Sequence, residues 1–394
     1  MRRSSGRRVF ALAGVLALVT CNAALADEAP KSWWQLITLN AYASASYTWN
    51  FNDPQSNLNQ LRAFDYDSNS IRIDAAELVV QKAVAQKGEF GFRVDVAFGA
   101  VAKVAAARGL FRDPTTNASL DIDLQQAFAS YIVPLGHGLR VDVGKFVTPV
   151  GAEFIDGYDG YNDNFSRSFL FTLAIPFTHT GLKLTYPFND KFAATVMVVN
   201  GWDNVLDNNA AKSFGVALAI TPLAPLTIYL NYIGGPERDN DNTDFRHLVD
   251  AGVVYKPTPR WSFTVNADWG MDMNAIVPVS SVPTADTGVA AGGASPAASN
   301  AQWAGVAGDI RCQATRRFAL IVRGEAFWDV DGFRTGTAQR LLEATLTPEV
   351  RITDGLLVRA DARIDNSNQA VFQRSDGLLR HYQPTLGINA LYVF

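Results

Sequence analysis

The stretch from Thr148 to Pro176 gathers the side chains most able to act on a passing solute or ion. Four acids and one base lie on it, at Glu153, Asp156, Asp159, Asp163 and Arg167. If these charges faced a narrow, water-filled space, they would favour cations weakly, because exposed charges act only over short distances at physiological salt. Aromatic residues on the same stretch favour packing inside a larger structure. We therefore expect a charged constriction here, and the alternative is a structured loop on a rim.

His179 follows this stretch and adds a second kind of chemistry. With Ser166, Ser168 and Asp156 nearby in the sequence, it could form a Ser-His-Asp group for hydrolysis. The sequence gives no geometry, and hydroxyls and acids are common near any histidine, so we expect no catalytic residue and keep His179 as a constriction candidate. The other three histidines lack metal-ligand spacing, and we expect no metal and no cofactor.

Alternating segments must position these side chains. In "RWSFTVNADWG" the residues Trp261, Phe263, Val265, Ala267 and Trp269 share one face, and polar residues take the other. The two tryptophans are about 26 Å apart along a strand at roughly 3.3 Å per residue. An apolar band with an aromatic residue at each end is typical of strands that cross a membrane as part of a barrel. A soluble sandwich is the alternative for any single segment.

Charges lie in register on the polar faces of these segments. "LLVRADARID" alternates apolar residues with four charges, and "RLLEATLTPEVRI" follows the same pattern. So many charges suit the wall of a water-filled channel. The candidates for this lumen wall are Arg93, Asp95, Asp121, Asp123, Arg140, Asp142, Asp268, Arg323, Glu325, Glu343, Arg359, Asp361 and Arg363.

Short turns and long polar stretches alternate along the chain, which is typical of outer-membrane barrels. Eight long stretches with seven short turns between them predict a transmembrane antiparallel β-barrel of about 16 strands, within a range of 14 to 18. The fold class is all-β, with short periplasmic turns and long extracellular loops. The short turns are 86–88, 134–138, 187–190, 222–225, 256–260, 315–317 and 353–355. The long stretches lie near 51–68, 104–119, 148–176, 203–211, 235–244, 273–301, 330–338 and 367–382.

The first 26 residues have the pattern of a secretory signal peptide, with four arginines, an apolar run and a small-x-small site ending at Ala26. Lipidation at Cys21 is a weaker alternative. Cleavage removes four arginines and no acid, which leaves 30 basic and 38 acidic residues and a net charge of −8. That balance gives no footprint for nucleic acid. Residues 27–394 would then form the barrel, with Cys312 as the one remaining cysteine.

The chain closes on "PTLGINALYVF", in which Leu386, Ile388, Ala390, Tyr392 and Phe394 share an apolar face. We expect this segment to be the closing strand, with Phe394 facing lipid at the periplasmic interface. Such an aromatic-ending strand resembles the signal that the outer-membrane assembly machinery recognises, and we expect that machinery to be a partner.

Several motifs occur in order between residues 120 and 215: "DLQQAFASYIVPLGHGL", "GKFVTPVGAE", "SRSFLF", "PFTHTG" and "VVNGWDNVLDNN". Together they resemble the OmpL-like β-barrel porin family of Gram-negative bacteria. The likeness is close over this region and holds for the rest by pattern only. It implies an outer-membrane barrel with channel activity, and it brings no functional residues that could be carried over.

The leading hypothesis is a porin of the Gram-negative outer membrane that lets small hydrophilic solutes or ions diffuse passively. The alternatives are a barrel enzyme that hydrolyses lipid or peptide, and a structural or adhesive barrel without an open pore. Outer-membrane lipid and lipopolysaccharide are expected partners. Asp239, Asp241 and Asp244 lack the full pattern of a calcium loop, and we expect a solvated acidic surface loop that divalent ions bridge to lipopolysaccharide. Whether the chain forms a homo-oligomer is a question that the sequence leaves open. The Ala-rich and Gly-rich loop near 273–301 is expected to be mobile.

Overall fold

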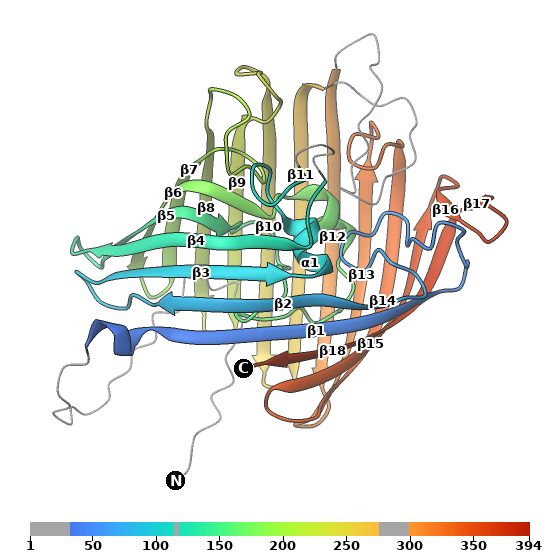
Figure 1. Ribbon diagram of the computed structural model, residues 1–394, viewed down its shortest axis with the longest axis horizontal. Helices are drawn as coiled ribbons and strands as arrows, with labels where there is room; N and C mark the ends of the chain where they lie inside the picture. The colour runs from blue at the N-terminus through green and yellow to red at the C-terminus, as the bar shows by residue number, and fades with distance from the viewer. Residues whose placement is uncertain (1–31, 114–117, 276–298) are drawn as a thin grey trace.

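The computed structural model describes residues 32–113, 118–275 and 299–394 of the chain, and the predicted signal peptide lies outside them. Sixteen antiparallel strands form a closed barrel in the order β1-β18-β15-β14-β13-β12-β11-β10-β9-β8-β7-β6-β5-β4-β3-β2. In Figure 1 the strands β1 to β4 run across the front of the barrel, and upright strands that include β10 and β11 lie behind them. The barrel strands are β1 (Thr38–Asn50), β2 (Ile71–Lys82), β3 (Phe90–Phe98), β4 (Ile122–Val133), β5 (Leu139–Val147), β6 (Thr178–Asn189), β7 (Phe192–Val199), β8 (Ser213–Leu223), β9 (Leu226–Pro236), β10 (Phe245–Thr258), β11 (Trp261–Ala275), β12 (Ser299–Gln313), β13 (Phe318–Asp329), β14 (Gln339–Arg351), β15 (Leu356–Ser367) and β18 (Tyr382–Val393).

Alternating burial along the strands confirms the two faces that the sequence predicts. In β14 every second side chain from Arg340 to Leu346 is exposed on the outer face, and those between them are buried. Trp261 and Trp269 of β11 are likewise exposed, as expected for side chains that meet lipid. Among the described residues, no helix is long and apolar enough to cross a membrane.

The last strand closes the ring, as the sequence predicts. β18 pairs with β15 on one side and with β1 on the other, where Tyr42 lies opposite Val393. The backbone N–H of Phe394 donates to the carbonyl of Ala41 at 2.9 Å, and its ring is exposed. The aromatic terminus is therefore part of the wall and has a lipid-facing side chain.

Each of the seven predicted short turns joins two neighbouring strands. Each of the eight predicted long stretches also lies between two consecutive barrel strands. The last long loop adds a small hairpin of β16 (Phe372–Gln373) and β17 (Leu379–Arg380). Short helical turns η1 (Trp33–Leu36) and α1 (Ala100–Ala105) lie outside the barrel strands. Most of the loop near 273–301, expected to be mobile, lies outside the described residues.

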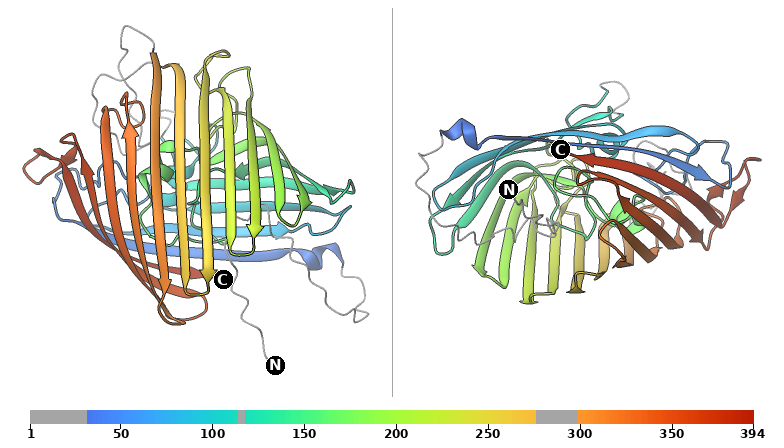
Figure 2. Two further views of the ribbon diagram at one scale, coloured as in Figure 1. Left: turned by 180° about the vertical axis from the view of Figure 1, so that it is seen from behind. Right: turned by 90° about the horizontal axis from the view of Figure 1, so that it is seen from below.

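The barrel interior contains packed side chains as well as charged ones. Phe64, Phe169, Trp202, Trp303 and Phe327 are all at least nine-tenths buried and belong to one apolar cluster. Three of them come from loops, so the long loops fold inward to pack against the inner wall. The right-hand view of Figure 2, from below, shows loop segments between the strands near the N-terminus, drawn in blue, and the strands drawn in yellow and orange on the opposite side of the barrel.

Candidate pore constriction

The loop from Thr148 to Phe177 connects β5 to β6 and touches the inner wall formed by β9, β10 and β11. The N–H of Gly151 donates to Asp250 at 3.3 Å, and the N–H of Ala152 donates to Asn266 at 2.8 Å. The side chain of Asn231 donates to the carbonyl of Pro149 at 3.3 Å. These contacts hold the first part of the loop through neutral backbone groups.

The same loop reaches the wall formed by β13, β14 and β15 through charged groups. Glu153 forms an ion pair with Arg323 at 2.9 Å, and Asp156 pairs with Arg359 at 2.8 Å. Both arginine side chains are fully buried, so each charge depends on its partner for stabilisation. The loop therefore spans the lumen from one wall to the other.

The two remaining loop acids also face bases on the wall. Asp159 pairs with Arg93 of β3 at 2.6 Å, and Asp163 pairs with Arg311 of β12 at 2.7 Å. All four acids of the candidate constriction thus have a cationic partner, and Asp156 has a second one in Arg167 at 2.9 Å. The excess of acid over base within the loop is therefore not a free negative charge.

A short π-helical turn, η2 (Leu170–Ala174), ends the inward part of the loop. The N–H groups of Phe169, at 2.7 Å, and Leu170 donate to Glu325. The indole N–H of Trp303 donates to the carbonyl of Ala174 at 3.2 Å. Leu170 packs over Gly305, where an added Cβ would lie 2.5 Å from the Leu170 side chain, so the glycine makes room for the turn.

The end of the loop is anchored by Asp203, which lies between β7 and β8. Its carboxylate accepts the N–H groups of Phe177 and Thr178, each at 2.8 Å. Burial raises the pKa of Asp203 to about 6, although these two hydrogen bonds partly oppose the shift. The anchor is therefore sensitive to pH.

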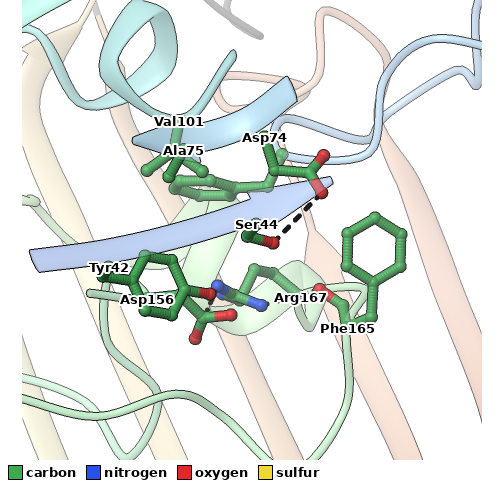
Figure 3. Close-up of a pocket in the computed structure, with 9 residues that line it drawn as sticks. Tyr42, Ser44, Asp74, Ala75, Val101, Asp156, Phe165 and Arg167 are labelled. Carbon is green, nitrogen blue, oxygen red and sulfur yellow. Dashed lines mark hydrogen bonds and ion pairs between the residues drawn. The ribbon is translucent and has the colours of Figure 1, made fainter. Parts of the chain in front are cut away.

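A small cavity of about 10 Å³ lies where the loop meets β1 and β2, and Figure 3 shows its lining. Asp156 and Arg167 of the loop face Tyr42 across this cavity, while the hydroxyl of Ser44 donates to Asp74 at 3.3 Å. A space of this size holds about one water molecule. The loop is thus closely packed against β1 and β2. The nine lining residues are Tyr42, Ser44, Phe64, Asp74, Ala75, Val101, Asp156, Phe165 and Arg167.

Twelve of the thirteen lumen-wall candidates lie on barrel strands, and most have a charged partner. On the wall formed by β3 to β5, Asp95 pairs with Arg93 at 2.7 Å, and Arg140 pairs with Asp142 at 2.8 Å. Asp123 pairs with Lys145 at 2.9 Å, a partner that the sequence reading missed. The exception is Asp121, which is exposed and lies one residue before β4, so placing it on the wall was wrong. The alternation in the sequence begins before the first residue of β4, but the strand pairing does not.

The rest of the wall candidates surround the arginines that hold the loop. Arg323 contacts Glu343 at 3.0 Å, and Asp361 accepts the N–H of Ser166 at 2.7 Å. Arg363 pairs with Asp365 at 2.7 Å and donates to the carbonyl of Arg167. Asp268, by contrast, lies opposite Asp250 on β10, and within the described part of the chain no group donates a hydrogen bond to either of its carboxylate oxygens.

His179 lies apart from the loop acids, on β6, and is fully buried. Its Nδ1 lies 2.9 Å from the carbonyl of Gly201, and its Nε2 lies 3.1 Å from the hydroxyl of Thr148. Ser166 and Ser168 instead bond to Asp361 and Glu153. His179 thus serves to tie β6 to neighbouring loops. In the described part of the chain, no group of three or more His, Cys, Asp or Glu side chains is arranged to hold a metal ion.

The acidic loop near residue 240 is compensated by arginines. Asp239 pairs with Arg108 at 2.7 Å, and this hydrogen bond lowers the pKa of Asp239. Asp244 pairs with Arg238 at 3.0 Å. The loop is therefore cross-linked by charge to its neighbours, which gives little support to a calcium-like site.

Sequence reasoning missed several residues that hold the interior. Arg62, from the loop after β1, pairs with Asp365 at 2.6 Å and with Asp65. Arg311 pairs with Glu349 as well as with the loop. Arg311 could have been found, because alternation in "AGDIRCQ" places Asp309 and Arg311 on one face. Arg62 carries no such signal, because it lies in an irregular loop.

The closed ring, the lipid-facing aromatic residues and the charged interior with an inward loop define an outer-membrane β-barrel of the porin class. The model of the family described as "Putative beta-barrel porin-2, OmpL-like" matches residues 36–394, so the chain belongs to this family. This confirms the resemblance seen in the sequence, and it places the protein in the outer membrane. No curated protein sequence matches significantly.

Solved porin structures share the fold at low sequence identity. The outer membrane channel DcaP of Acinetobacter baumannii is 10% identical with a TM-score of 0.58, over 91% of this chain and 97% of that one. Salmonella typhi OmpF, in complex with daunomycin, is 12% identical with a TM-score of 0.58, over 91% and 97%. An anion-selective porin from Comamonas acidovorans is 9% identical with a TM-score of 0.55, over 91% and 99%. At these identities the likeness shows the fold alone.

Proposed function

We propose that this porin is a passive channel for small hydrophilic solutes or ions, and that the loop from Thr148 to Phe177 forms its narrowest part. The observation that carries the proposal is the set of contacts from this loop to inward-facing side chains on opposite walls. A 16-strand ring is too wide for wall side chains alone to fill, so a loop that crosses it determines the free width.

Liposome swelling tests this proposal. Vesicles that contain the protein should swell in small neutral sugars and amino acids, at a rate that falls as solute size rises. Vesicles that contain heat-denatured protein serve as the blank. Swelling that equals the blank for every solute would overturn the channel.

A barrel closed by its own loops is a second candidate, and one observation favours it. The inward loops pack into a continuous apolar cluster with Trp303 and Phe327 of the wall. In that case wild-type vesicles would not swell, whereas a variant with a shortened loop would. The two candidates therefore differ in a single comparison.

We also propose that the protein is not an enzyme. Both ring nitrogens of His179 are engaged by Gly201 and Thr148, and the nearby serines bond to other acids. Release of fatty acid or peptide by purified protein, abolished in His179→Ala, would contradict this.

The remaining partners are proposals as well. The position of Phe394 at the end of the closing strand supports recognition by the outer-membrane assembly machinery. Deletion of Phe394 should lower the amount of folded protein in the outer membrane. Cross-linking in native membranes would show whether the chains associate into a homo-oligomer.

A further inference from the structure

Two arginines, Arg340 and Arg380, lie near the end of the barrel that bears the long loops. Arg340, the second residue of β14, is exposed and alternates with the buried residues Gln339 and Leu341. Arg380 precedes β18 and lies over the ring of Tyr382, with its side chain 3.3 Å from the tyrosine hydroxyl. Neither arginine pairs with an acid among the described residues, whereas Lys212, Arg238 and Arg374 each do.

Both arginines lie at the same height on the wall. Arg340 exchanges hydrogen bonds with Asn368 just beyond β15, at 2.7 and 3.2 Å. One residue earlier, Ser367 donates to the carbonyl of His381 at 2.7 Å. Because β14, β15 and β18 are neighbours, the two arginines are about 10 Å apart at the backbone, two inter-strand spacings.

Strand β1, which pairs with β18, adds an aromatic cavity to this surface. A cavity of about 490 Å³ on the outer surface is lined by Tyr47, Trp49, Phe51, Asp53 and Asn69. The rings of Trp49 and Phe51 are stacked at 5.3 Å, and each is more than half exposed. Asp53 and Asn69 give the cavity a polar end, where their side chains are 3.4 Å apart.

The cavity is continuous with the arginines. The N–H of Phe51 donates to Pro384 of β18 at 3.1 Å, and the amide of Asn52 donates to the carbonyl of Tyr382 at 2.8 Å. From Arg340 to Phe51 the surface spans about 14 Å across β14, β15, β18 and β1. It combines aromatic rings, polar groups and two guanidinium groups that have no acidic partner in the described parts of the chain.

The chemistry of this surface selects its occupant. A guanidinium that faces lipid is costly in hydrocarbon, so at this height it needs an anionic headgroup, and arginine pairs with phosphate through two hydrogen bonds. Aromatic rings beside a carboxylate and an amide suit a sugar ring and its hydroxyls. We propose that this surface binds a phosphorylated glycolipid of the outer leaflet, with phosphate at Arg340 and Arg380 and the sugar and acyl parts near Trp49 and Phe51. The proposal rests on the outer-membrane setting and extracellular loop orientation of the proposed function, and it names a site for the expected lipopolysaccharide partner.

Binding of purified lipid A to the detergent-solubilised full-length protein tests the site. Lipid A is a bis-phosphorylated glucosamine disaccharide that carries acyl chains. The double variant Arg340→Gln with Arg380→Gln should bind it at least about tenfold more weakly, since charge-assisted contacts are lost. Trp49→Leu with Phe51→Leu should also weaken binding. The matched control, Arg316→Gln with Arg317→Gln, makes the same charge change at an exposed periplasmic turn and should bind as the wild type does.

Each other outcome overturns the site. Unchanged binding by the arginine variant, or an equal loss in the control, would show that binding is not localised here. Equal affinity of wild type for phosphatidylglycerol, with the same loss in the arginine variant, would show a phospholipid headgroup site instead. A gel shift between heated and unheated protein confirms that each variant is folded. Failure of the channel proposal appears separately, as absent solute swelling with lipid binding intact.

Discussion

The wall formed by β13 to β15 and the wall formed by β9 to β11 hold the same loop in different ways. On the first wall, buried arginines pair with Glu153 and Asp156. On the second, backbone N–H groups of Gly151 and Ala152 donate to Asp250 and Asn266. A buried ion pair leaves an uncompensated charge when one partner is removed, whereas loss of one neutral hydrogen bond costs about 0.5–1.5 kcal/mol. The loop is therefore fixed mainly by its charged side.

The comparison also changes the expected origin of ion selectivity. Counting charges along the loop predicts a weak cation preference from its four acids. In the structure each of these acids faces an arginine, so the loop and its wall together are close to neutral. Asp250 and Asp268 of the other wall have no ion pair with a base among the described residues, but both are buried and lie opposite each other. Two carboxyls in such a place share a proton, so the pair carries one negative charge at most.

The largest expected effect comes from removing the base at the centre of the charged wall. Arg323→Ala leaves Glu153 without a basic partner and Glu343 with only the more distant Arg363 at 3.8 Å, and it should lower the free energy of unfolding by about 3–5 kcal/mol. It should also release the loop and raise single-channel conductance. Urea unfolding and bilayer recordings measure the two effects.

Arg140→Ala is the matched control for that variant. Arg140 pairs with Asp142 on β5, but the Arg140 side chain is about one-third exposed. Its loss should therefore lower the free energy of unfolding by no more than about 1 kcal/mol. Equal destabilisation by the two variants would break the distinction between buried and exposed pairs.

The next effect concerns ion preference. Glu153→Gln with Asp156→Asn keeps hydrogen-bond acceptors but leaves Arg359 without its acid and Arg323 with Glu343 alone, so the reversal potential should shift towards anions. The shift should grow at low salt, because the screening length rises from about 8 Å at 0.15 M to about 30 Å at 0.01 M. Asp376→Asn removes an exposed acid paired with Arg374 and should leave the reversal potential unchanged. A shift of equal size in both would place the selective charges outside the loop.

A smaller effect follows from the anchor at Asp203. Because its pKa in the folded protein is raised to about 6, the folded state binds more protons than the unfolded state between about pH 4 and 6. Its contribution to stability is therefore greatest at low pH and is lost as pH rises through about 6. Asp203→Asn keeps the acceptor for Phe177 and Thr178, so it should gain about 1–3 kcal/mol on the wild type at pH 7.5 but not at pH 4. A difference that does not vary with pH would mean that Asp203 is ionised throughout.

The last effect concerns the wall formed by β9 to β11. Asn266→Ala removes the acceptor for Ala152 and one donor to Asp250, and should cost about 1–3 kcal/mol for the two bonds. Conductance should change less than in Arg323→Ala. If Asn266→Ala opens the channel as fully as Arg323→Ala does, the wall formed by β9 to β11 holds the loop as strongly as the wall formed by β13 to β15.

The sequence predicted the strands, turns and lipid-facing surface because these depend on local alternation. Trp261, Trp269 and Phe394 lie where a period of two places them. The inward course of the loop depends on contacts such as Glu153 with Arg323, which are 170 residues apart and leave no local pattern. Asp121 shows the limit of periodicity, which continues beyond the end of a strand. Trp303 shows another, since an aromatic residue faces inward because a loop packs against it.

The most direct test of the loop as the narrowest part is single-channel conductance in a planar bilayer. Wild type is compared with a variant in which residues 155–168 are replaced by a short Gly-Ser linker, which removes Asp156, Asp159, Asp163 and Arg167 and the contacts they make. We predict a small, finite conductance for the wild type and a severalfold larger one for the variant. A gel shift between heated and unheated protein confirms that both proteins are folded. Equal conductance in the two proteins would contradict it.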